Sequence, residues 1–144
     1  MRGLRADWAF AAALFMLALP AASVVAQSRS PFDGTWVVVL TCTAAHDGAA
    51  GYTFRFPATV QNGILHGENG VRGQAGSMFL DGSIAADGQA MLVAQGLTNN
   101  PVYSVGRVPP AMPYTYHLQS TFQPTRGTGK RIELRPCEAV FSRQ

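Results

Sequence analysis

Period-two alternation of apolar and polar residues recurs through this chain after residue 26. Every second residue from Tyr52 to Val60 is apolar, and the residues between them are polar or proline. Side chains of a β-strand point alternately to opposite faces, whereas a helix repeats every 3.6 residues. The segment 52–61 therefore predicts a strand with one buried face, and this pattern excludes a long helix there.

The same pattern, punctuated by glycine and proline, predicts a chain made almost entirely of short antiparallel strands. Expected strands cover residues 35–43, 52–61, 64–66, 78–84, 89–95 and 114–122, with one long bent strand or two short ones over 130–141. Asn62-Gly63 is a strong signal for a tight hairpin. Glycine-rich residues 67–77 and residues 96–113 are expected to be loops, and residues 124–129 a turn.

Seven or eight strands with one apolar face each must close into a barrel or fold into a sandwich. The two cysteines help to choose, because Cys42 ends the first expected strand and Cys137 lies in the last. An even cysteine count in an exported domain favours a disulfide, although two free thiols are the alternative. A disulfide requires Cα atoms within about 7 Å, so the first and last strands would be neighbours. We therefore expect a small antiparallel up-and-down β-barrel of about eight strands, with a sandwich as the alternative.

The first 26 residues have the order of a secretory signal peptide. Arg2 and Arg5 precede an apolar run over residues 8–19, Pro20 interrupts it, and small residues occupy 24–26. The run is shorter than the ~20 residues that a transmembrane helix needs. We expect a cleaved signal at 1–26 and a single periplasmic or secreted domain at 27–144, without a membrane span. An uncleaved N-terminal anchor is the alternative.

The charge pattern argues against nucleic-acid binding. The full chain has a formal net charge of +3, and the expected signal removes Arg2, Arg5 and Asp7 from this balance. Only Lys130-Arg131 places two cations side by side. Nucleic-acid-binding domains cluster basic residues on one face, often with aromatic residues between them. We predict no nucleic-acid partner.

No catalytic or metal-binding motif stands out in the sequence. His46, His66 and His117 are not at metal-ligand spacing, and the two cysteines lack the CxxC context of a zinc site. No Gly-x-Ser-x-Gly elbow accompanies the histidines. We therefore expect a protein that is not an enzyme and uses no metal or cofactor, with a hydrolase as the less favoured alternative.

Aromatic residues suggest where a partner would bind. The long loop 96–113 carries Tyr103 and Arg107 and leads into Tyr114 and Tyr116. Aromatic residues and arginine dominate many binding surfaces, so these four are the candidate site for a small apolar ligand or a protein. Two other interpretations stay open: the loop is a structural flap, and the aromatic residues fill the core.

An alternative function is inhibition of an exported hydrolase, either a protease or a lysozyme. After signal cleavage, residues 28–32 would form a mobile arm that could enter an active site.

Two resemblances add expectations. Gly34-Thr35-Trp36 resembles the Gly-x-Trp opening of lipocalins and avidins, small ligand-binding barrels. This resemblance implies that Trp36 closes the barrel floor and that Arg131 or Arg135 packs over it by cation–π contact. The wider pattern, from residues 32–36 through 127–129 to 135–137, is similar to small uncharacterised exported proteins of Gram-negative bacteria. It implies a periplasmic or secreted domain and no particular activity.

Overall fold

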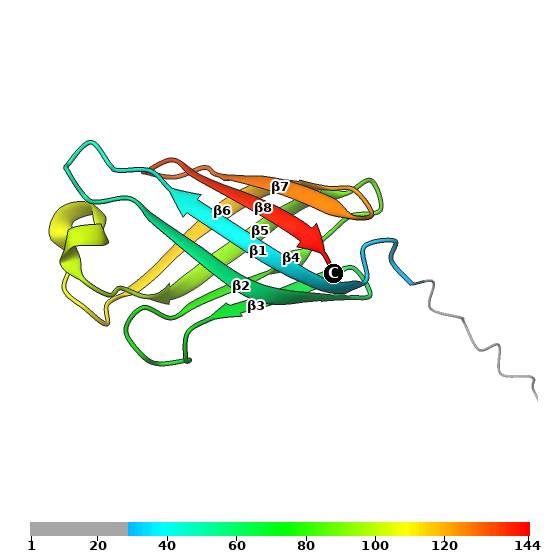
Figure 1. Ribbon diagram of the computed structural model, residues 1–144, viewed down its shortest axis with the longest axis horizontal. Helices are drawn as coiled ribbons and strands as arrows, with labels where there is room; N and C mark the ends of the chain where they lie inside the picture. The colour runs from blue at the N-terminus through cyan, green and yellow to red at the C-terminus, as the bar shows by residue number, and fades with distance from the viewer. Residues whose placement is uncertain (1–28) are drawn as a thin grey trace, which may run out of the picture.

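Eight antiparallel strands form a closed barrel in sequence order, as Figure 1 shows. The computed structural model describes residues 29–144, so the expected signal peptide lies outside the described residues. The strands are β1 (Gly34–Cys42), β2 (Tyr52–Gln61), β3 (Ile64–Asn69), β4 (Met78–Ser83), β5 (Gln89–Leu97), β6 (Pro113–Phe122), β7 (Arg126–Arg131) and β8 (Cys137–Arg143). The predicted fold class is confirmed, and the sandwich alternative is excluded.

The alternation that predicted the strands is the alternation of burial in the barrel. Along β2, Phe56, Ala58 and Val60 are buried inside, and the residues between them are exposed. The Asn62-Gly63 hairpin between β2 and β3 is also confirmed. Both residues have positive φ, at 52° and 75°, as a two-residue turn between right-twisted strands requires.

The disulfide connects the two strands that close the barrel. Cys42 and Cys137 are directly paired between β1 and β8, and their Cα atoms lie 4.0 Å apart. The strand pairing runs from this pair to Trp36 and Arg143 at the other end of β1. The expected link between the first and last strands is thus confirmed.

Aromatic side chains fill one end of the barrel. We call it the closed end, and it lies to the right in Figure 1. Trp36 is fully buried and packs edge-on against Phe122, with ring centroids 5.7 Å apart. Phe141 and Phe32 pack on the same Phe122 ring. The indole Nε1 of Trp36 donates a hydrogen bond to the carbonyl of Phe32 at 2.9 Å. This end of the barrel is a packed core.

The expectation that Arg131 or Arg135 packs over Trp36 is wrong. The Arg131 guanidinium lies over Tyr116 and that of Arg135 faces Tyr52, near the opposite ends of the strands. Arg143, at the end of β8, is instead the strand partner of Trp36. It donates to the carbonyls of Pro31, Asp33 and Pro124, because β8 ends where the chain enters β1.

Several strands extend beyond the predicted limits, β5 and β8 each by two residues. The expected loop 67–77 begins later, because β3 continues to Asn69, and the expected turn 124–129 is mostly strand β7. Gly127 and Gly129 lie on the inner face of β7. A Cβ atom at Gly129 would lie 2.4 Å from the Ser120 hydroxyl. The glycines are therefore needed for close packing inside the barrel, although a glycine-rich segment is typical of a turn.

The segment before β1 is packed against the barrel within the described residues. Phe32 is buried in the closed end, and the carboxylate of Asp33 accepts hydrogen bonds from the backbone of Ser30 and Gly63. The hypothesis that residues 28–32 form a mobile arm is therefore wrong for residues 30–32, which make these contacts. Residue 28 lies outside the described part. Across 29–144, no helix is long and apolar enough to span a bilayer.

We predict that loss of the disulfide lowers the free energy of unfolding by about 4 kcal/mol, because the bond restrains a long loop in the unfolded chain. The comparison is wild type against Cys42→Ala/Cys137→Ala in urea unfolding, without reductant. Reductant should destabilise the wild type and leave the double variant unchanged. Equal stability of the two proteins, or reactive thiols in the denatured wild type, would contradict the prediction.

Candidate functional site

The end of the barrel opposite Trp36, which we call the mouth (left in Figure 1), holds a cavity of about 580 Å³. Its wall is formed by the start of β2, the ends of β5 and β7, and the start of β6. Tyr52, Phe54, Tyr114 and Tyr116 come from these strands and line it. The barrel is thus filled at one end and hollow at the other.

The aromatic wall is held in a regular arrangement. The rings of Tyr114 and Tyr116 stack with centroids 5.9 Å apart and an interplanar angle of 10°, because the two residues are separated by one on β6. The Tyr114 hydroxyl donates to the carbonyl of Ser77 at 3.3 Å. Burial raises the pKa of Tyr52, Tyr114 and Tyr116 above the usual tyrosine value. These hydroxyls are therefore uncharged over the physiological range.

The long loop between β5 and β6 covers one side of the mouth. It contains two short 3-10 turns, η1 (Pro101–Tyr103) and η2 (Val105–Arg107). Hydrogen bonds attach it to the β1–β2 loop: Ala50 N donates to the Val102 carbonyl at 2.8 Å, and Gly106 N donates to the Asp47 carboxylate at 2.6 Å. The bond from Gly106, followed by one from the backbone N–H of Ala49, lowers the pKa of Asp47. The loop is a docked wall of the cavity.

Arg135 fixes the loops around the mouth. Its side chain is buried, with 4% of the residue exposed. The guanidinium donates to four backbone carbonyls: those of Thr43, Ala49 and Ala50 in the β1–β2 loop and that of Tyr103 in η1. Arg135 thus connects its own β7–β8 loop to the β1–β2 loop and to η1. Arg135 therefore has a structural role, as the sequence predicted. It acts at the mouth, however, and does not pack over Trp36.

Arg131 is the second arginine of the cavity, and its hydrogen-bonding groups are mostly unused. It is the inward-facing residue at the end of β7, and its guanidinium lies 3.9 Å from the centre of the Tyr116 ring. Its Nε is buried without a hydrogen-bond partner. Its Nη1 has one weak contact, with the Cys137 sulfur at 3.9 Å. Arg131 therefore presents an unpaired cation to an aromatic cavity.

Three of the four predicted site residues meet at the cavity. Tyr103, Tyr114 and Tyr116 line it, whereas Arg107 does not. The Arg107 guanidinium donates to the Gly48 carbonyl at 3.3 Å and so helps to hold two loops together. The sequence analysis missed Arg131 as a cavity residue. Its alternation with Gly127 and Gly129 was the available signal, but those glycines were assigned to a turn.

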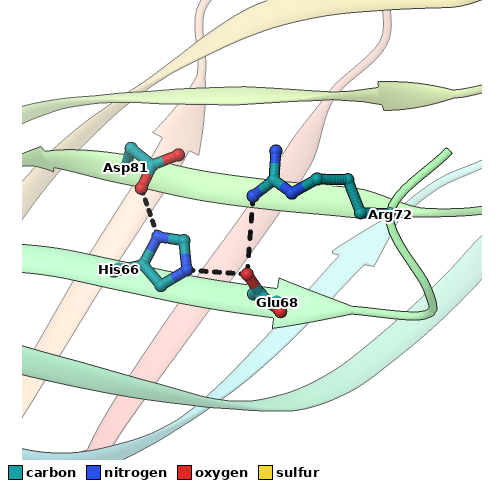
Figure 2. A network of polar contacts seen from close by, with 4 residues as sticks. All are labelled: His66, Glu68, Arg72 and Asp81. Atoms are coloured by element: carbon teal, nitrogen blue, oxygen red, sulfur yellow. Dashed lines mark hydrogen bonds and ion pairs between the residues drawn. The ribbon is translucent and has the colours of Figure 1, made fainter.

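A polar cluster lies on the outer face of the barrel, on β3, β4 and the loop between them (Figure 2). His66 Nδ1 lies 2.5 Å from the Asp81 carboxylate, and its Nε2 lies 2.9 Å from Glu68. Arg72 completes the cluster with a longer contact to Glu68 at 3.5 Å. The hydrogen bond to Asp81, followed by that to Glu68, raises the pKa of His66, and the bond to His66 lowers that of Glu68.

This cluster resembles part of a catalytic or metal site in composition only. Within residues 29–144, no group of three or more His, Cys, Asp or Glu side chains is placed to hold a metal ion. The side chains of the cluster are roughly half exposed. The cluster is therefore best described as a cross-strand ion network that supports the β3–β4 pair.

The barrel and its mouth define the protein as a small closed β-barrel with a single-ended, aromatic-lined cavity. Comparisons with family models, with curated proteins and with solved structures find no match to the chain.

We predict that Arg135→Met lowers the free energy of unfolding by about 3 kcal/mol or more, because four carbonyls lose a charged donor in a buried position. Urea unfolding measures the change. Arg55→Met, on the exposed face of β2, is the matched control and should change stability little. A loss at Arg135 no larger than at Arg55 would contradict the structural role.

We predict that His66 titrates above the usual histidine pKa of about 6.5. A raised folded-state pKa means that the His66 ion pairs stabilise the barrel fully below the unfolded pKa, and that this stabilisation is lost as the pH rises through the folded pKa. NMR titration of the imidazole measures the pKa directly. His66→Gln should therefore destabilise the protein more near pH 6 than near pH 9, with His46→Gln on the exposed β1–β2 loop as control. A pH-independent effect of His66→Gln would refute this assignment.

Proposed function

We propose that this protein is an exported, non-enzymatic binding protein that holds a small, largely apolar molecule in the mouth of its barrel. The observation that carries the proposal is the cavity of about 580 Å³ among Tyr52, Phe54, Tyr114 and Tyr116. Ligand pockets for small molecules commonly fall between about 300 and 1,000 Å³ and have mostly apolar walls.

The contrast between the two ends of the barrel supports a binding role. Inward aromatic residues at the closed end pack against one another, and Trp36 is fully buried among them. Inward aromatic residues at the mouth instead surround a void. Protein interiors are normally packed to the density of organic crystals. An open aromatic cavity of this size is therefore better explained by a ligand than by the needs of folding.

The fixed geometry of the mouth supports the same proposal. Arg135 and the Cys42–Cys137 disulfide hold the loops and strands that border the cavity. A preformed site loses less conformational freedom when a ligand enters, which favours affinity. The disulfide also fits an oxidising compartment and so supports the exported part of the proposal.

The alternative of a hydrolase inhibitor gains no support from the N-terminal segment. That hypothesis relied on a mobile arm over residues 28–32, and Phe32 is buried in the closed end. The mouth cavity is the stronger candidate because it combines volume, aromatic walls and fixed loops at one place.

We predict that the protein binds 1-anilinonaphthalene, an uncharged aromatic fluorophore, with an increase and blue shift of its fluorescence. Leu97→Trp places a larger side chain in the cavity wall and should weaken binding at least about tenfold. Ile64→Trp introduces the same residue on the exposed face of β3 and is the matched control. Fluorescence titration and thermal unfolding of all three proteins separate binding from stability.

Two results would contradict the proposal. The first is absence of saturable binding by the folded wild type. The second is equal binding by Leu97→Trp and wild type, which would place the fluorophore on the outer surface.

A further inference from the structure

The charges in the mouth cavity are unbalanced. Two guanidinium groups line it, and none of its lining residues is Asp or Glu. The two arginines differ, because Arg135 donates to four backbone carbonyls while Arg131 has only the weak contact to the Cys137 sulfur. The cavity therefore contains one cation whose hydrogen-bonding capacity is satisfied and one whose capacity is free.

No acidic group of the described chain forms a close ion pair with Arg131, although its charge adds to the hydrogen bonds from His117 that lower the pKa of Glu133. Within residues 29–144, no carboxylate lies within 4.0 Å of its guanidinium. The nearest acidic candidate, Glu133, follows it in the β7–β8 loop. Its carboxylate accepts a hydrogen bond from the backbone N–H of His117 at 2.9 Å and lies 2.5 Å from His117 Nδ1, on the outer side of β6. Glu133 is thus already paired elsewhere.

The surroundings of Arg131 make this unpaired charge costly. Its guanidinium lies on the face of Tyr116, which is itself buried, and its Nε is shut off from solvent. Cation–π contact compensates a cation only in part. Arg131 is partly buried, and a charge that is partly withdrawn from water is destabilised unless an anion pairs with it. An anion that enters the cavity would remove this cost.

We propose that the mouth cavity selects a small amphipathic monoanion, whose carboxylate forms an ion pair with Arg131 and whose apolar body lies among Tyr52, Phe54 and Tyr114. This inference rests on the proposed function and specifies the chemistry of its ligand. The guanidinium is planar and matches a carboxylate with two parallel N–H donors.

The single free cation sets the charge of the ligand. A dianion such as a phosphate monoester would need a second counter-charge, and the other guanidinium of the cavity is occupied by carbonyls. The neutral tyrosine hydroxyls can donate hydrogen bonds but supply no positive charge. One negative charge on an apolar molecule is therefore the best match to the cavity.

The test compares two ligands that differ only in the head group. Decanoate and decan-1-ol are titrated against protein that is saturated with 1-anilinonaphthalene, and displacement is followed by fluorescence at neutral pH. We expect decanoate to bind wild type at least about tenfold more tightly than decan-1-ol, as a charge-assisted hydrogen-bonded pair allows. 1-Anilinonaphthalene-8-sulfonate, the monoanion of the same fluorophore, should likewise bind more tightly than the uncharged form.

Variants assign this preference to Arg131. Arg131→Gln should bind the alcohol within about threefold of wild type and lose the tenfold preference for the acid. Arg131→Lys keeps the positive charge but lacks the planar guanidinium, and it should retain part of the preference for the acid. Arg55→Gln removes one positive charge from the exposed face of β2 and should retain all of it. If Arg131→Gln does not fold, the wild-type comparison and Arg131→Lys still decide the question.

The outcomes separate the two proposals. Equal affinity of wild type for acid and alcohol, or an unchanged preference in Arg131→Gln, overturns the anion inference while binding in the cavity stands. Failure of every ligand, including 1-anilinonaphthalene, to bind the folded wild type overturns the proposed function and this inference with it.

Discussion

The pairing of β1 with β8 is the interaction on which the rest of the structure depends. It removes the two edges of an eight-strand sheet and turns one apolar face into a closed interior. The disulfide between Cys42 and Cys137 stabilises this pairing at the mouth, and Arg143 with Trp36 completes it at the closed end. Without closure, the sheet would expose unpaired backbone groups along both edges.

Closure also explains why the two ends differ. At the closed end, the entering segment folds back under the barrel, so that Phe32 and Trp36 pack against Phe122. At the mouth, the connecting loops are longer and dock on one another through Arg135 and Arg107. The loops border the opening without filling it. The cavity lies at this end, lined by Tyr52 from β2 and by Tyr114 and Tyr116 from β6.

The two arginines of the mouth illustrate how surroundings decide the role of a side chain. Arg135 occupies a shell of carbonyl oxygens and orders three segments of chain. Arg131, four residues earlier at the end of β7, lies on an aromatic ring with little else to bind. The first arginine serves stability, and the second is available for a ligand.

The sequence was sufficient for the fold class because alternation and turn chemistry are local properties. The strands at 52–61 and 114–122 and the Asn62-Gly63 hairpin were all predicted from neighbouring residues. The cysteine positions added one long-range constraint, which favoured a barrel over a sandwich. The prediction was wrong where a residue is required by a neighbour on another strand, as Gly129 is because Ser120 packs against it.

The candidate site could be predicted only in part for the same reason. Tyr103, Tyr114 and Tyr116 are at the cavity, but Arg107 belongs to a loop contact and Arg131 was assigned to the wrong end. By itself, the sequence determined that the chain forms short antiparallel strands with one buried face and a link between first and last. Only the tertiary structure decided which end is hollow and which arginine is left unpaired. Both depend on contacts between residues far apart in the chain, and such contacts leave no periodic trace in the sequence.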